Sequence, residues 1–454
     1  MSARTLIILG ATGDLTQRLL LPGLDSVIAM AESGGRPLDI DLMGVGRMAE
    51  SAPDWQAALE RSIGSGPIRD RVRETARYAS GDVTEPETLQ RLFDEAPNSP
   101  VLYLALPPQV SESVVDALGS VRFPDDLRLA IEKPFGVDGR TAAALNARLA
   151  RLIPESQVHR VDHFLGMSTV LNLLGLRFAN RAIEAIWNAD HVASIEIRFD
   201  ESLALEGRAE YYDRVGALVD MIQSHLLLVH ALVTMDAPPS LDPHHLHDSM
   251  MAALAATRLR GEPAEASRRA RFTAGNVDGV NVPAYVDEDG VDAERNTETL
   301  VELELESIHA RFAGVPIVLR SGKALGEPVT EIRLVLRKSH NRPAGLRGDA
   351  PPTSIIVSLA PEKLAIELDI NGAHDPFTLD RVTLSTDFAK GKLTAYGEVI
   401  AGILDGDDTL SVRGDIVEAC WGLVDPVLAT WRSGAVPLDS YAAGSGGPRE
   451  WASQ

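Results

Sequence analysis

The first third of the chain alternates short apolar runs with segments in which apolar residues recur at helical spacing. The apolar runs lie at residues 5–9, 40–45, 101–105 and 127–131. The segments with helical spacing lie at residues 15–31, 54–63, 111–118 and 140–152. The runs are apolar on both faces, which is typical of strands buried in a parallel sheet. Strands that alternate with helices predict βαβ units, and so an α/β domain.

The rest of the chain has a different pattern. Helical spacing recurs at residues 168–188, 215–234 and 415–431. Strand candidates lie at residues 193–199, 299–305, 332–336, 353–360 and 364–370. Because most of these strands follow one another without an intervening helix, we expect a mostly antiparallel sheet with helices on one face. The sequence therefore predicts an α/β domain followed by an α+β domain.

A loop with two glycines joins the first predicted strand to the first predicted helix. It reads Gly10-Ala11-Thr12-Gly13-Asp14-Leu15. Gly10 would permit a tight turn, and Gly13 would let the backbone approach a pyrophosphate at the positive end of the following helix. An ordinary βα turn is the alternative explanation. The position after the first strand favours a Rossmann-like dinucleotide-binding domain.

The end of the second predicted strand bears on the choice of coenzyme. Arg47 follows this strand directly. An acidic residue at this point favours the 2′-hydroxyl of NAD, whereas an arginine can pair with the 2′-phosphate of NADP. We therefore expect Arg47 to bind NADP, with NAD as an alternative coenzyme. A solvated arginine at a strand end would give the same sequence.

The charge balance excludes several classes of protein. The chain of 454 residues has 43 Lys and Arg against 65 Asp and Glu, a net charge of −22. Such an acidic chain is poorly suited to nucleic acid. We expect no membrane span, because long uncharged apolar runs are missing, and no secretory signal. A single cysteine, Cys420, rules out an internal disulfide. We expect a cytoplasmic protein.

Several motifs, taken in order, resemble the glucose-6-phosphate dehydrogenase family. They are GATGDL (10–15), ALPP (105–108), EKPFG (132–136), RVDHFLG (160–166), EGRAEYYD (206–213), NTET (296–299), AGVP (313–316), RSGKAL (320–325) and YAAGSGGP (441–448). The resemblance implies a Rossmann-like domain at residues 1–160 and a larger β+α domain at 161–454, which binds substrate and forms a homodimer or a higher homo-oligomer. It also implies oxidation of a hexose or hexose phosphate at the anomeric carbon to the lactone, with hydride transfer to NAD(P).

The resemblance implies roles for individual residues. His225 is the expected base for the anomeric hydroxyl, with Asp162 holding its imidazole. Lys133 would act beside the reacting carbon, fixed by a cis peptide bond before Pro134. The expected coenzyme-binding residues are Gly10, Thr12, Gly13, Asp14, Leu15, Arg47, Ala105, Pro107 and Lys133. The expected substrate-binding residues are Lys133, His163, Phe164, Met167, Glu201, Asp220, His225 and Lys323.

The match to the family is weakest where the 6-phosphate should bind. The family typically has R-I-D-H-Y-L-G-K, whereas this chain has Phe164 and Met167 in place of the tyrosine and the lysine. Two further family lysines are replaced by Leu19 and Pro328. Losing such partners costs a dianion several kcal/mol, or roughly 1,000-fold in affinity. We therefore expect a non-phosphorylated or modified hexose, with glucose 6-phosphate itself as the alternative.

Other readings of the sequence remain open. If the substrate is phosphorylated, Arg18, Arg177 and Arg181 are candidate replacements for the missing lysines. A non-catalytic regulatory relative is a further alternative, although the retained Asp162 and His225 argue against it.

The segment PHHLHD at residues 243–248 resembles a metal-binding cluster. We interpret its histidines as residues of a free loop, because no partner spacing elsewhere supports a closed site. We expect no metal cofactor.

Overall fold

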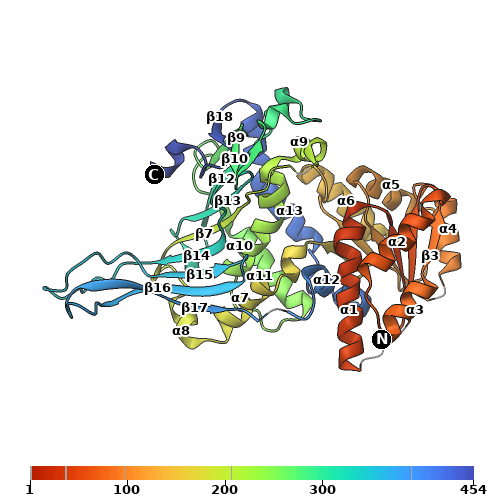
Figure 1. Cartoon of the computed structure of the whole chain (residues 1–454), viewed down its shortest axis with the longest axis horizontal. Helices are drawn as coiled ribbons and strands as arrows, with labels where there is room; N and C mark the ends of the chain where they lie inside the picture. Colours follow the sequence, from red (N-terminus) through yellow and green to blue (C-terminus); the bar gives the residue numbers. More distant parts are fainter. Residues whose placement is uncertain (1–2, 36–37, 97, 206, 390, 454) are drawn as a thin grey trace. The chain divides into compact units, whose positions relative to one another are not determined.

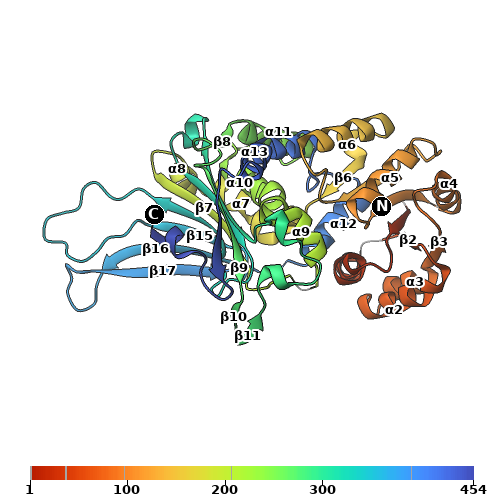
Figure 2. The ribbon, with the colours of Figure 1, turned by 90° about the horizontal axis from the view of Figure 1, so that it is seen from above.

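The computed structural model describes residues 3–35, 38–96, 98–205, 207–389 and 391–453, and Figures 1 and 2 show it from two directions. Glu206, the first residue of the EGRAEYYD segment, lies outside the described residues. The chain forms two compact units. Unit 1 comprises Met1–Ser168, Pro238–Ser249 and Lys390–Glu418, and unit 2 comprises Thr169–Ala237, Met250–Ala389 and Ala419–Gln454. Unit 1 therefore includes two segments from the later part of the sequence.

The centre of unit 1 is a six-stranded parallel sheet with the order β3-β2-β1-β4-β5-β6. Its strands are β1 (Arg4–Leu9), β2 (Ile40–Gly46), β3 (Arg77–Ser80), β4 (Ser99–Leu104), β5 (Arg128–Glu132) and β6 (Val158–Val161). All six residues of β1 are buried. The direction of winding reverses between β1 and β4, which is the point where doubly wound sheets bind their ligands. The predicted α/β domain is confirmed.

Helices connect these strands. They are α1 (Leu21–Gly34), α2 (Ala52–Ser62), α3 (Pro67–Thr75), α4 (Pro86–Glu95), α5 (Pro108–Leu118) and α6 (Gly139–Leu152), and a π-helical turn, η1 (Thr16–Leu20), precedes α1. Helix α6 starts with a capping box, in which the Asp138 carboxylate accepts a hydrogen bond of 2.7 Å from the backbone N–H of Thr141.

A helix from the later part of the chain completes the core of unit 1. Tyr396, Val399 and Ile400 of α12 (Ala395–Asp405) pack in the same apolar cluster as α1. The two helices approach closely at glycines: a Cβ on Gly23 would lie 3.0 Å from the Cβ of Tyr396, and one on Gly397 would lie 2.2 Å from the Ser26 hydroxyl. Bulkier residues at these two positions would push α12 away from α1.

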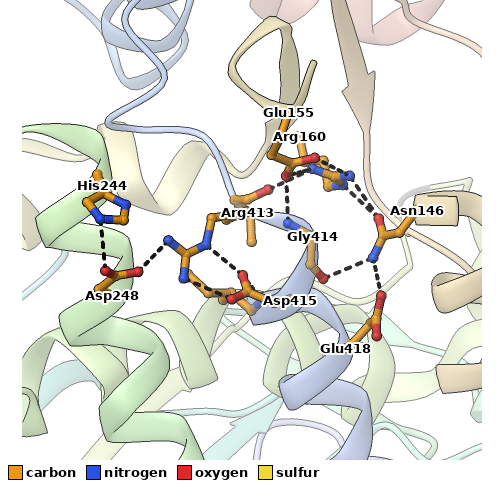
Figure 3. A network of polar contacts seen from close by, with 11 residues as sticks. Asn146, Glu155, Arg160, His244, Asp248, Arg413, Gly414, Asp415 and Glu418 are labelled. Carbon is orange, nitrogen blue, oxygen red and sulfur yellow. Dashed lines mark hydrogen bonds and ion pairs between the residues drawn. The ribbon is translucent and has the colours of Figure 1, made fainter. Parts of the chain in front are cut away.

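A polar network, shown in Figure 3, holds the end of this returning segment on unit 1. Arg160 of β6 is almost fully buried and donates to Glu155 at 2.6 Å and to Asn146 at 2.8 Å. Glu155 accepts from the backbone N–H of Gly414 at 2.8 Å, and Asn146 donates to the Gly414 carbonyl at 2.9 Å. Next to this, Arg413 pairs with Asp248 and Asp415, so both later segments of unit 1 take part in the network.

Unit 2 is built on a ten-stranded sheet. Along the sheet the order is β17-β16-β15-β14-β7-β13-β12-β9-β18, and β8 also pairs with β12. The strands are β7 (Val192–Asp200), β8 (Thr257–Leu259), β9 (Ser267–Thr273), β12 (Leu300–Ser307), β13 (Ile317–Gly322), β14 (Thr330–Leu336), β15 (Ser354–Ser358), β16 (Lys363–Asn371), β17 (Leu379–Asp387) and β18 (Leu438–Ala442). The pairs β7·β13 and β9·β18 are parallel and the other pairs are antiparallel. The prediction of a mostly antiparallel sheet is confirmed.

Helices lie on one face of this sheet (Figure 2). They include α7 (Ser168–Phe178), α8 (Arg181–Ile186) and the run of α9 (Ala209–Ala217), π-helical η5 (Leu218–Leu226) and α10 (Leu227–Thr234), which is kinked at Gly216. The run Ala209–Thr234 is long and apolar enough to cross a membrane by composition, yet 83% of its most apolar window is buried inside the protein. It is the core helix of unit 2.

The histidine-rich segment at residues 243–248 is helical, so the expectation of a free loop is wrong. Helix α11 (Pro243–Ala255) begins there, and α13 (Gly414–Arg432) is the last long helix of the described chain. Asp242 caps α11, because its carboxylate accepts a hydrogen bond of 3.1 Å from the backbone N–H of His245. Of the three histidines, His247 is buried, whereas His244 and His245 pair with nearby aspartates.

Candidate active site

The glycine loop of unit 1 lies where the ends of β1, β2 and β4 meet. Gly10 has a φ of +90°, and a Cβ there would lie 2.1 Å from the carbonyl oxygen of Ala105. The backbone N–H groups of Gly10 and Ala11 both donate to the Val45 carbonyl at 3.0 Å, and Gly13 donates to the Gly10 carbonyl at 3.0 Å. Only glycine fits at Gly10, so the loop is a tight cradle at the ligand-binding end of the sheet.

The remaining predicted coenzyme residues lie around this cradle. Thr12 and Leu15 are half-buried, and Asp14 is exposed, 3.5 Å from Arg18 one helical turn later. Pro107 follows β4, next to Ala105, and its carbonyl accepts a hydrogen bond from Ser111 in the first turn of α5. The loop and the end of β4 therefore belong to one local surface of unit 1.

Arg47 is exposed at the end of β2. It lies close enough to Asp82 to act on that carboxyl, whose pKa is lowered first by hydrogen bonds from Thr84 and to a smaller extent by Arg47. An exposed guanidinium at this point of the sheet can meet an anionic group on the adenosine ribose.

Lys133 and Glu132 lie at the end of β5. The Lys133–Pro134 peptide bond is cis, as the resemblance implied. Tyr103 of β4 donates a hydrogen bond of 2.5 Å to the Glu132 carboxylate. Burial raises the pKa of Glu132 to about 7, against the opposing effects of Tyr103, Lys133 and Tyr396. Glu132, the residue before Lys133, therefore has a desolvated carboxyl with polar groups around it.

Asp162 and His163 follow β6, the next strand of the same sheet. The buried Asp162 carboxylate accepts a hydrogen bond of 3.0 Å from the backbone N–H of Phe164, which fixes the turn. The His163 imidazole stacks on Tyr396, with 5.5 Å between ring centroids and 12° between the planes. It meets Phe164 edge-on at 5.1 Å. Phe164 is buried and Met167 is half-buried. Neither apolar side chain offers a polar partner to a ligand.

Unit 2 contributes a second group of predicted residues. Lys323, which is almost fully buried, donates a hydrogen bond of 2.6 Å to Glu201, and its ammonium lies 5.5 Å from the centre of the Tyr212 ring. The backbone fixes this pair: Glu201 donates to the Gly322 carbonyl at 2.8 Å, next to Lys323. A paired cation and anion held in this way can hydrogen-bond several sugar hydroxyls.

His225 and Asp220 both lie on the π-helical segment η5. His225 is buried, and Asp220 is partly exposed. Burial is the main cause of the raised pKa of Tyr212, and Asp220 and Glu201 add to it, so both carboxylates lie near this phenol. Wide π-helical turns are common at functional sites. Asp162 belongs to unit 1 and His225 to unit 2, and their pairing stays a prediction.

The structure corrects one candidate phosphate ligand. Arg177 is buried and donates to the backbone carbonyls of Leu232 and Met235 while its guanidinium packs on Phe178 and Trp187. These contacts hold Arg177 in the core, so its assignment as a phosphate ligand is wrong.

The other residues considered for the 6-phosphate end of the site are exposed to solvent. Arg18 is exposed beside Asp14, and Arg181 is exposed and pairs with Glu184 at 3.0 Å. Leu19 is exposed on η1, and Pro328 is exposed before β14.

Two residues of the site were missed by sequence reasoning. Tyr103 lies inside an apolar run and has the pattern of an ordinary core residue. Tyr396 contacts His163 although it lies far along the chain, and no local signal connects the two.

Comparisons with known proteins match both parts of the chain. The model of the glucose-6-phosphate dehydrogenase NAD binding domain matches residues 7–172, and the model of the glucose-6-phosphate dehydrogenase C-terminal domain matches residues 174–453. Glucose-6-phosphate 1-dehydrogenases of Treponema pallidum (strain Nichols) and Gluconobacter oxydans (strain 621H) are each 35% identical over 98% of this chain, covering 92% and 94% of their own lengths. A solved glucose-6-phosphate dehydrogenase in complex with its substrate glucose-6-phosphate has a TM-score of 0.87 and 26% identity, over 99% of this chain and 96% of that one.

Proposed function

Because the chain belongs to the glucose-6-phosphate dehydrogenase family, we propose that it oxidises glucose 6-phosphate at the anomeric carbon to the lactone. It is an NADP-dependent dehydrogenase that acts on a CH–OH donor. One observation supports this choice of substrate: the fold matches, over 99% of the chain, an enzyme in complex with glucose 6-phosphate. The non-phosphorylated hexose expected from the sequence has no comparable support.

The residues of unit 1 fit a dinucleotide. The cradle at Gly10 leaves no room for a Cβ, which suits a backbone that must approach a pyrophosphate. Gly10, Thr12, Gly13, Asp14 and Leu15 would hold the pyrophosphate side. In the same arrangement, Arg47 would meet the 2′-phosphate. Bound NADP supplies a nicotinamide that accepts the hydride.

The chain's own residues handle the proton and the sugar. His225 takes the proton of the anomeric hydroxyl as the C1–H bond breaks, so that the C1–O bond becomes the carbonyl of the lactone. In this proposal Asp162 accepts the other imidazole N–H and stabilises the charged ring, as the acid of a catalytic triad does. Lys133 stabilises the oxygen on which negative charge develops.

The sugar hydroxyls are assigned to groups that the structure holds rigid. The Glu201–Lys323 ion pair and Asp220 supply acceptors and donors on unit 2. His163 is assigned to the 6-phosphate end, where the histidine of the family motif is retained. Of the candidate arginines, Arg18 and Arg181 have exposed guanidinium groups that could add charge there.

A substrate comparison tests this function. Initial rates are measured with NADP and NAD on glucose 6-phosphate, glucose and other free hexoses. We expect kcat/KM for glucose 6-phosphate to exceed that for glucose by orders of magnitude. Faster turnover of glucose would instead support the alternative expected from the sequence, a dehydrogenase of non-phosphorylated hexoses. NADP binding without turnover of any sugar would identify a non-catalytic relative.

We also propose a homodimer that works in the cytoplasm. Apolar side chains are exposed on or next to β16 and β17 of unit 2, namely Ile370, Phe377 and Leu384. Exposed apolar groups gathered on outer strands are typical of protein interfaces. Light scattering on the eluting protein measures the mass in solution, and a mass of one chain at micromolar concentration would contradict the dimer.

A further inference from the structure

The contact between Tyr396 and His163 joins two parts of unit 1 that are distant in sequence. His163 follows β6, whereas Tyr396 lies in the first turn of α12. Their rings are nearly parallel, with an interplanar angle of 12° and a centroid separation of 5.5 Å. Phe164 meets the imidazole edge-on, with 5.1 Å between ring centroids. The imidazole is therefore packed by two aromatic rings, one of which is nearly parallel to it.

Tyr396 is connected to the strand that carries Lys133. Hydrogen bonding from Tyr396 is one of the effects that lower the pKa of Glu132, and the negative charge of Glu132 raises the pKa of Tyr396 after burial. Glu132 also accepts the short hydrogen bond from Tyr103. The phenol of Tyr396 thus has its hydroxyl next to the carboxylate before Lys133 and its ring face on His163.

We propose that Tyr396 is a positioning residue that orients His163 for the substrate and links it, through Glu132, to the segment that carries Lys133. This inference rests on the proposed function, in which His163 and Lys133 both serve the sugar phosphate. Tyr396 itself needs no contact with the substrate for this role. A histidine locked in one ring orientation recognises an anion better than one that must be ordered on binding.

The anchoring of α12 gives this arrangement its rigidity. Tyr396 is buried, and its backbone segment is pressed against α1 at Gly23 and Gly397. The other end of the returning segment is held by the network of Arg160, Glu155 and Gly414 (Figure 3). Arg160 lies on β6, the strand that leads into His163. Strand β6 therefore contacts the returning segment that contains Tyr396 as well as leading into His163.

Two substitutions separate the ring from the hydroxyl. Tyr396→Leu removes both while keeping apolar bulk, and Tyr396→Phe removes the hydroxyl alone. For Tyr396→Leu we expect KM for glucose 6-phosphate to rise about three- to tenfold, the range of a lost aromatic pair. We expect the dissociation constant of NADP to stay within about twofold. For Tyr396→Phe, which keeps the stack, KM should rise less than in the leucine variant.

Val399→Ala is the matched control, because Val399 is buried on the same helix and packs in the same core. It measures the effect of loosening α12 without removing the ring. A rise in KM no larger in Tyr396→Leu than in Val399→Ala would overturn the proposal. So would a parallel loss of NADP affinity, since that would indicate a general structural role.

A spectroscopic readout keeps this test separate from the substrate assignment. In protein with nitrogen-15-labelled histidine, the His163 ring signals are assigned by their loss in His163→Gln. We expect these signals to shift in Tyr396→Leu and to stay in place in Val399→Ala. If glucose 6-phosphate is not turned over but the shift is seen, the proposed function fails and the positioning contact stands. Unchanged signals in Tyr396→Leu would overturn the positioning role.

Discussion

Replacing Glu298 by glutamine should remove a large loss of folding stability that the unmodified protein suffers as the pH rises. Glu298 is buried in unit 2, and its carboxylate accepts a hydrogen bond of 2.9 Å from the backbone N–H of Leu218, at the start of the π-helix that carries His225. Gly216, with a φ of +72°, makes the space: a Cβ there would lie 2.5 Å from the carboxylate. Glu298 therefore caps the N-terminus of η5 from within the core.

Two opposing effects determine the pKa of Glu298. Burial favours the neutral acid, whereas the backbone N–H groups and Arg269 favour the carboxylate. Burial wins, and the pKa rises from 4.5 to about 7. Below pH 4.5 the carboxyl is protonated whether the chain is folded or unfolded. As the pH rises towards 7, the unfolded chain gives up its proton first, so the stability of the folded chain falls.

The size of this loss follows from the two pKa values. A tenfold change in a protonation equilibrium is worth about 1.4 kcal/mol, so the full loss is roughly 3 kcal/mol and is complete above about pH 7. Glutamine keeps an oxygen that can accept the Leu218 hydrogen bond and has no charge to desolvate. The free energy of unfolding of Glu298→Gln, relative to the unmodified protein, should therefore rise by about 2–3 kcal/mol between pH 4.5 and pH 8.

Urea unfolding followed by tryptophan fluorescence measures this difference at several pH values. Glu294→Gln is the matched control, because it makes the same exchange at an exposed position a few residues away, where no buried carboxyl is removed. If the free energies of unfolding of Glu298→Gln and the unmodified protein changed with pH in parallel, the prediction would be wrong, because burial would then not favour the neutral form of this carboxyl.

The remaining predictions concern the reaction. Arg47→Ala should weaken NADP binding by roughly 10- to 100-fold and leave NAD nearly unchanged, as measured by fluorescence titration, and equal losses would contradict its place at the 2′-phosphate. His225→Ala should lower kcat by about 100-fold or more with little change in NADP affinity, and near-normal turnover would exclude it as the base. Gly10→Ala places a Cβ 2.1 Å from the Ala105 carbonyl, so coenzyme binding should be lost while unit 2, monitored by limited proteolysis, stays folded; normal NADP binding would show that the cradle is not needed.

Much of the fold could be predicted from the sequence, and the misses have physical causes. The strands β1, β2, β4 and β5 are apolar on both faces and were predicted. Strand β6 was not, because it reads VHRV, and its His159 and Arg160 look polar although both are buried. Each has a partner that the sequence does not reveal: Ser411 at 2.9 Å for His159, and Glu155 with Asn146 for Arg160.

The candidate site was likewise predicted in part and missed in part. The cis peptide bond that the motifs predicted at Lys133–Pro134 is present, and Glu201 and Lys323, two of the expected substrate-binding residues, lie in contact. Their binding of sugar hydroxyls stays a prediction. The misjudged helix at residues 243–248 did have a local signal, the aspartate–proline start at Asp242, which the run of histidines obscured. The contact of Tyr396 with His163 had none, because it depends on the return of α12 to unit 1.

That return has a consequence for how the protein is made. The apolar face of α1 is covered by Tyr396, Val399 and Ile400, which are synthesised long after the six parallel strands. While the chain is still emerging from the ribosome, the nucleotide-binding unit therefore has an open side that only nearly complete synthesis can close. A fragment ending at Ser168 would keep every strand of its sheet and still expose that core to water, so this coenzyme unit should not be separable as an independent N-terminal piece.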